Sequence, residues 1–97
     1  MLFIRTKSQV EKKTQIEKLK YIPMPIMCHI DDRIFVAEKL SLLHERYRER
    51  IAGLYTKIFL INLHDPKISD LKRLGHARQK ANEWILEFIN GIIENNS

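Results

Sequence analysis

The stretch NLHDPKIS, residues 62–69, divides the apolar part of this chain into two halves. Asp65 has a side chain that suits the N-cap of a helix, and Pro66 suits the first helical turn. The sequence therefore predicts that one helix ends near Leu63 and that another begins near residue 66. Because the connection between them is short, we expect the two helices to fold back on each other as an antiparallel hairpin.

The residues before this stretch have the apolar spacing of a helix. Apolar side chains recur at steps of three or four, as they do along one face of a helix. This regularity predicts one long helix over residues 33–63, with Asp31 or Asp32 as its N-cap. The expected buried seam of this helix is formed by Val36, Leu40, Leu43, Tyr47, Ile51, Leu54, Ile58 and Ile61.

The residues after the stretch repeat the same steps of three and four. They predict a second long helix over residues 66–93, and its seam would face that of the first helix. The expected seam residues, with Trp84 beside them, are Ile68, Leu71, Leu74, Ala77, Ala81, Ile85, Phe88 and Ile92.

The N-terminal third is more polar. Residues 6–21 have few apolar positions and predict a short N-terminal helix. Residues 22–32 contain Pro23 and Pro25, which exclude a helix interior and favour an extended strap over the core. A chain of 97 residues is expected to form one domain, residues 1–97. The predicted fold class is all-α: an antiparallel hairpin of two long helices with a short N-terminal helix.

Residues 51–63 are apolar on more than one side of the first long helix. One partner helix cannot cover such a surface, so either the N-terminal helix or a second copy of the chain must do so. We favour a homodimer that completes a helical bundle with coiled-coil-like spacing. The residues expected at this oligomer interface are Ile51, Leu54, Ile58, Phe59, Leu60 and Leu63.

The charges of the last predicted helix are unevenly distributed. The chain has 17 basic and 12 acidic residues, a net charge of +5. Residues 67–80 are mainly basic, whereas residues 81–97 contain glutamates and neither lysine nor arginine. This order opposes the helix dipole. Two copies of the helix packed antiparallel would place basic halves against acidic halves. Phosphates of a nucleic acid would be an alternative partner for the basic half.

The basic cluster of this helix lies opposite its apolar seam, with Arg78 on the flank. Lysines near the N-terminus of the chain provide a second basic patch. The residues expected to contact a partner or a nucleic-acid backbone are therefore Lys72, Arg73, His76, Arg78, Lys80, Lys12 and Lys13.

The sequence has few of the patterns that carry catalysis or bind metals. It contains no HExxH motif and no glycine-rich phosphate loop. Residues 28–32, CHIDD, bunch a thiol, an imidazole and two carboxylates, but a buried cysteine beside a helix cap explains them better. Arg73 and His76 could act in a helical ribonuclease, although their spacing fits such an enzyme poorly. We expect no enzyme, no cofactor, no metal site and no small-molecule substrate.

The composition also bears on location and function. The most apolar stretch, residues 51–63, includes Lys57 and is too short to span a bilayer. The single cysteine, Cys28, favours a reducing compartment, and we expect a cytoplasmic protein. The leading hypothesis is a non-enzymatic protein-interaction module, such as an adaptor, regulator, chaperone or immunity-type bundle, that docks through a helix face. The alternative is a nucleic-acid-binding protein, or a small subunit of a nucleoprotein complex, that contacts the phosphate backbone.

Overall fold

A computed structural model describes residues 21–95 of the chain. In this part a short 3-10 helix, η1 (Ile30–Asp32), precedes the α-helices α2 (Arg33–Ser41), α3 (Glu45–Leu63) and α4 (Asp70–Asn95). No strand occurs among the described residues, which confirms the predicted all-α class. The helix predicted over residues 6–21 lies outside the described residues, except for Tyr21, which belongs to a turn.

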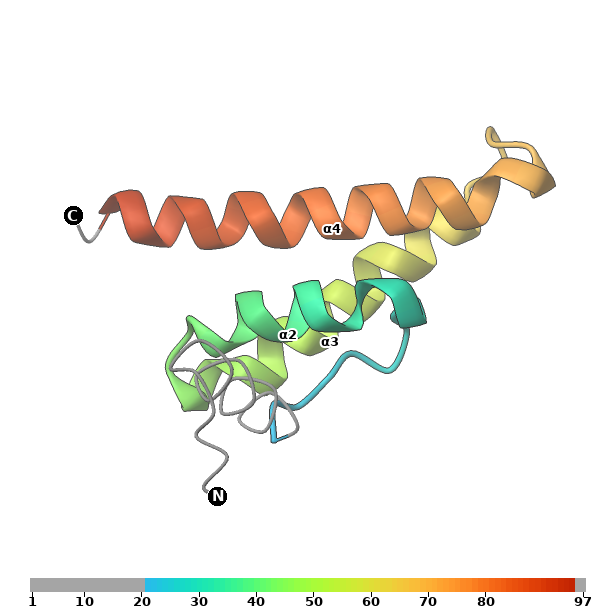
Figure 1. The fold of residues 1–97 in the computed structure, drawn as a ribbon. Coiled ribbons are helices and arrows are strands. Elements are labelled where there is room, and N and C mark those ends of the chain that lie inside the picture. Colours follow the sequence, from blue (N-terminus) through green and yellow to red (C-terminus); the bar gives the residue numbers. More distant parts are fainter. Residues whose placement is uncertain (1–20, 96–97) are drawn as a thin grey trace, which may run out of the picture.

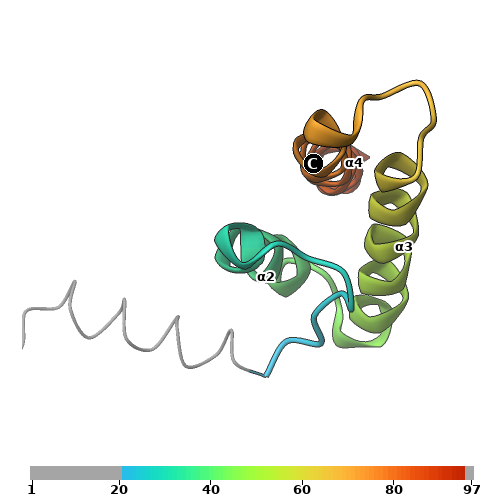
Figure 2. The ribbon, with the colours of Figure 1, turned by 90° about the vertical axis from the view of Figure 1, so that its right-hand side faces the viewer.

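The three α-helices pack around one core, with α4 lying across the other two (Figure 1). Seen along α4, α2 and α3 lie below it on opposite sides (Figure 2). The turn at residues 64–69 joins α3 to α4, and the two helices are closest near this turn. Away from the turn α3 diverges from α4, and α2 lies in the space that opens between them. The described chain is therefore a hairpin with a third helix packed into it.

The core is built from one buried stripe on each helix. The stripe of α4 consists of Ala77, Ala81, Ile85 and Ile89, which are four residues apart and fall on one face of the helix. Its two alanines lie in the half of α4 near the turn, where small side chains let α3 approach closely. Opposite them, α2 and α3 contribute Val36, Ala37, Leu40, Ile51, Ala52, Tyr55 and Phe59.

The prediction of one continuous helix over residues 33–63 is wrong, because the chain breaks between Ser41 and Glu45. His44 adopts an extended backbone (φ −60°, ψ 141°), and its Nδ1 accepts a hydrogen bond of 3.3 Å from the backbone N–H of Arg46. This side chain is therefore the N-cap of α3. The guanidinium of Arg48 satisfies the end of α2 by donating to the carbonyls of Leu40, Ser41 and Leu43 at 3.0–3.1 Å.

The predicted seam of α3 is also rotated from the observed one. Leu54, Ile61 and Tyr47 were expected inside, yet 38%, 60% and 48% of their surfaces are exposed. The buried residues of α3 are instead Ile51, Ala52, Tyr55 and Phe59. The rotation follows from the break at residues 42–44. Once α2 is a separate helix, α3 must face α2 and α4 together, so its buried side turns toward α2.

The second long helix begins at Asp70 rather than at residue 66. Oδ1 of Asp65 accepts a hydrogen bond of 2.9 Å from the backbone N–H of Lys67, so the aspartate closes a turn instead of capping a helix. Leu71, an expected seam residue in the first turn of α4, is 99% exposed. The prediction failed for Leu71 because the apolar spacing extends to the first turn of α4, where no neighbouring helix among the described residues covers this side chain.

Candidate functional site

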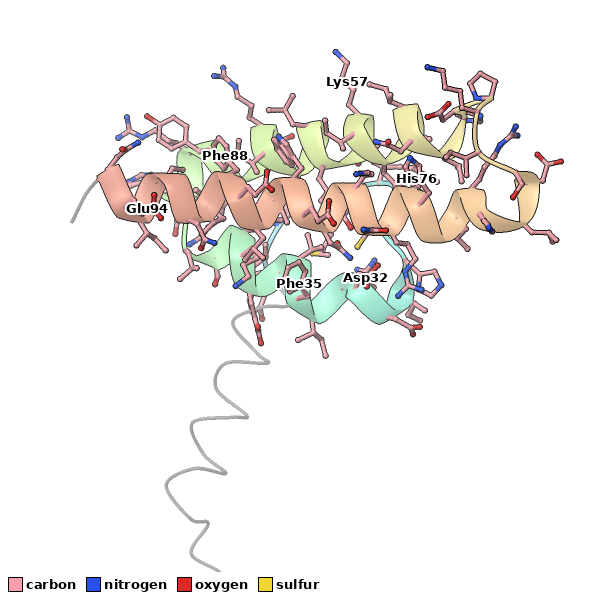
Figure 3. The ribbon with its side chains drawn as sticks, turned by 90° about the horizontal axis from the view of Figure 1, so that it is seen from above. Asp32, Phe35, Lys57, His76, Phe88 and Glu94 are labelled. Atoms are coloured by element: carbon pink, nitrogen blue, oxygen red, sulfur yellow. The ribbon has the colours of Figure 1, made fainter. Side chains whose placement is uncertain are left out.

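Four of the predicted contact residues lie on the side of α4 that faces away from α2. Lys72 and Lys80 are exposed, and His76, which Figure 3 shows near α3, is half-buried. Lys80 lies 3.8 Å from a carboxylate oxygen of Glu83. Arg73 forms an ion pair of 2.7 Å with Asp70, and its Nε donates to the carbonyl of Ile68 at 2.8 Å. Lys12 and Lys13 lie outside the described residues.

Arg78, the remaining predicted contact residue, binds within the chain instead. Its Nε and one terminal nitrogen donate to the two carboxylate oxygens of Asp32 at 2.9 and 3.1 Å. Asp32 is buried at the start of α2 (Figure 3), so this two-pronged ion pair ties α2 to the middle of α4. The predicted contact of Arg78 with an external partner stays a prediction, and within the chain its guanidinium is held by Asp32. Its flanking position on α4 was the only sign in the sequence that it could turn toward another helix.

The pair changes the acidity of the carboxyl group. Hydrogen bonds from Arg78 lower the pKa of Asp32 below its ordinary value of 3.8, although burial acts in the opposite direction. Because the pKa is lower in the folded chain than in the unfolded chain, the carboxylate stabilises the fold fully at pH values above 3.8. This stabilisation is lost as the pH falls through the folded pKa.

Replacing Asp32 by asparagine is expected to lower the free energy of unfolding at neutral pH by about 1–3 kcal/mol, because a charged hydrogen-bond acceptor is lost. The deficit relative to the wild type should begin to shrink once the pH falls below 3.8, where Asp32 of the unfolded wild-type chain becomes protonated, and it should disappear as the pH falls through the lower pKa of the folded chain. Urea unfolding measured from pH 7 to pH 3 would show this convergence. Asp31→Asn is the matched control, since Asp31 is mostly exposed and 3.9 Å from Arg78. A deficit that stays constant with pH would contradict the assignment.

A second polar group lies beside this pair in the core. The hydroxyl of Tyr55, which is fully buried on α3, donates to Oδ1 of Asn82 on α4 at 2.6 Å. Cys28 lies nearby, and burial raises the pKa of its thiol. A protonated thiol is a poor nucleophile. Burial likewise raises the pKa of Tyr55, so its hydroxyl remains a hydrogen-bond donor at physiological pH. This cluster joins helices and keeps its groups in their neutral forms.

The polar side chains of residues 28–32 form hydrogen bonds and an ion pair within the chain. Nδ1 of His29 accepts a hydrogen bond from the backbone N–H of Asp31 at 3.1 Å and so caps η1. Asp31 or Asp32 was predicted as the N-cap of the helix that begins at Arg33; Asp32 occupies that position of α2, but its side chain makes no capping hydrogen bond. Sγ of Cys28 lies 3.6 Å from the carbonyl of His29, and Asp32 is held by Arg78. Among residues 21–95 no group of three histidine, cysteine, aspartate or glutamate side chains is arranged to hold a metal ion.

The predicted oligomer interface is divided by the structure. Ile51 and Phe59 belong to the core of the single chain, where almost none of their surface is accessible to a second copy. Leu60 and Leu63 are half-buried. Leu54 is exposed, and Ile58 is half-buried next to it on the same side of α3. The apolar surface of α3 that a second copy could contact is therefore smaller than the sequence predicted.

Exposed and half-buried apolar side chains remain on the side of α3 and α4 that faces away from α2. Tyr47, Leu54, Ile58 and Ile61 lie beside the buried stripe of α3. At about 100° per residue, these four side chains fall on one side of that helix. Phe88 lies on the side of α4 toward α3 (Figure 3) and stacks on Trp84, with ring centroids 5.6 Å apart. We name this surface the apolar strip and define it by Tyr47, Leu54, Ile58 and Ile61 of α3 and Trp84 and Phe88 of α4.

Comparisons of the chain with protein-family models, with curated proteins and with solved structures found no match. In the described part of the chain, none of the helices combines the length and the apolar character needed to cross a membrane.

Proposed function

We propose that this protein is a non-enzymatic interaction module that binds a protein partner through the apolar strip on α3 and α4. The observation that carries the proposal is the exposure of Tyr47, Leu54 and Ile61 in one line along a helix that is otherwise well packed. Contiguous apolar surface on a small folded protein marks an interaction site, whereas scattered apolar residues do not. We place this activity in the cytoplasm, where Cys28 would stay reduced.

The strip is presented on a rigid support. Its residues flank the buried stripe of α3, which is held against α4 by Tyr55 and Phe59 and against α2 by the contacts of Arg48. The partner would therefore meet a preformed surface, and little conformational entropy would be lost from this side on binding. An amphipathic helix laid along the strip would bury its own apolar face in the same contact.

The nucleic-acid alternative has less support from the geometry. Of the predicted contact residues, Arg73, Lys80 and Arg78 already lie within 4 Å of a carboxylate of the same chain. Each such pair reduces the positive charge available to a phosphate backbone. Glu83 and Glu87 are exposed further along the same helix and would repel it.

The proposal is tested by placing a photoreactive amino acid at single positions of α3 in the native host. Leu54 and Ile61 of the strip are expected to give protein adducts at least about five times more abundant than those from Glu49 and Gly53. These two control positions are exposed on the outer side of α3. Equal yields from all four positions, or adducts from the strip that disappear after nuclease treatment, would overturn the proposal.

A further inference from the structure

The side of α4 next to the apolar strip carries its charges in an ordered series. At about 100° per residue, Arg73, Lys80, Glu87 and Glu94 fall within an arc of roughly 60° on this side. The series runs from two cations at the turn end of α4 to two anions at its C-terminal end. Trp84 lies between the two halves and belongs to the strip.

The positions of these four charges fit a two-fold axis between two antiparallel copies of α4. Lys80 and Glu87 are centred on the peptide that joins Glu83 to Trp84, and Arg73 and Glu94 are centred on the same peptide. One axis perpendicular to α4 at this peptide would therefore place each cation of one copy opposite an anion of the other. A parallel arrangement would oppose like charges. The pair of Lys80 with Glu83 is about half exposed, and Asp70, the carboxylate partner of Arg73, is mostly exposed; such surface pairs are weak enough to be shared or exchanged.

The arrangement of the helices bears on such a pairing. Figure 1 shows that α3 diverges from α4 away from the turn, so α3 does not run alongside the C-terminal half of α4. A two-fold axis at the middle of α4 would bring the turn end of the second copy, where α3 and α4 are close, against this half. Phe88 lies there, and Gly91 has open space around it that permits a close approach.

We propose that the partner which occupies the apolar strip is a second copy of this chain, with the two α4 helices antiparallel about this axis. This inference rests on the proposed function and names its partner. Burial of the strip supplies the attraction, while the four charges on each α4 select the antiparallel register. The contact is isologous, so the two copies form a closed pair rather than a filament.

The test is sedimentation equilibrium on the full chain, with the dissociation constant measured for charge variants. Lys80→Glu and Glu87→Lys are each expected to weaken the dimer at least about ten-fold, because like charges then meet across the axis. The double variant should return to within about three-fold of the wild type. Lys72→Glu is the matched control. Lys72 is exposed on the same helix and would face the uncharged Asn95, so its reversal should change the dissociation constant less than about three-fold.

A second measurement does not depend on these variants. In a Cys28→Ala background, Glu83→Cys lies next to the axis and should form a disulfide dimer rapidly with copper phenanthroline. Gln79→Cys, one turn further from the axis, would lie about 13 Å along the helix from its counterpart in the second copy and should not, because a disulfide cannot span that distance.

A chain that stays monomeric at high micromolar concentration would overturn the inference, as would charge variants without reciprocal rescue or equal crosslinking at the two cysteine positions. In each of these cases, photoadducts from Leu54 and Ile61 to a different protein would leave the proposed function standing. Absence of those photoadducts would remove the proposed function itself.

Discussion

Replacing Tyr55 by alanine is expected to lower the free energy of unfolding by about 3–5 kcal/mol, as for other large buried aromatic residues. Tyr55 is fully buried and is the largest such side chain among the described residues. It lies on α3 in the common core of the three helices, so its removal leaves a cavity that no single helix can close by shifting. Small domains have a total stability of about 5–15 kcal/mol, and this change would consume a large share of it.

Tyr55→Phe separates the two contributions of this side chain. The ring and its packing remain, and only the hydroxyl that donates to Asn82 at 2.6 Å is removed. Because Asn82 is half-buried and can still reach water, this variant should lose only about 0.5–1.5 kcal/mol. Urea unfolding followed by circular dichroism would measure both variants. A loss below about 1 kcal/mol for Tyr55→Ala would show that this residue does not lie in the core.

Ala81→Asp is expected to have the second large effect and to leave the chain mostly unfolded at neutral pH. Ala81 has no exposed surface and lies in the middle of the buried stripe of α4. An aspartate there would be an unpaired charge in the core, and burying such a charge costs several kcal/mol even after relaxation. The larger side chain would also push α4 away from the other helices.

Asn90→Asp is the control for this experiment. It introduces the same side chain on the same helix at an exposed position, where the change should stay within about 0.5 kcal/mol. Circular dichroism and urea unfolding of the two variants give the comparison. Native helix content in Ala81→Asp, with a stability like that of Asn90→Asp, would contradict the observed packing of α4.

These experiments also bear on the interaction surface. Tyr55 and Ala81 lie in the core that supports α3 and α4, so their substitution should abolish partner binding by loss of folding. Substitutions in the strip itself should abolish binding while helix content is retained, because Leu54 and Ile61 are exposed in the single chain. The two sets of variants therefore distinguish a residue that supports the surface from one that contacts the partner.

Several features of this protein were determined by the sequence alone. The steps of three and four between apolar residues identified the helical stretches, although not the break between α2 and α3, and the stretch NLHDPKIS located the turn between α3 and α4. The uneven charge of α4 was visible as well. These are local properties: helix periodicity and turn chemistry depend on residues that are near one another along the chain.

Only the tertiary structure decided which side of each helix is buried. The apolar spacing of α3 admits two neighbouring seams, one through Leu54 and one through Tyr55, and the position of α2 selects the second. The break after Ser41 depends on Arg48 reaching back to the end of α2, and Arg78 turns inward because Asp32 lies opposite it. These choices depend on contacts between residues far apart in the chain. The spacing of apolar residues shows that a helix has an apolar face, but it does not show which neighbouring helix will cover that face.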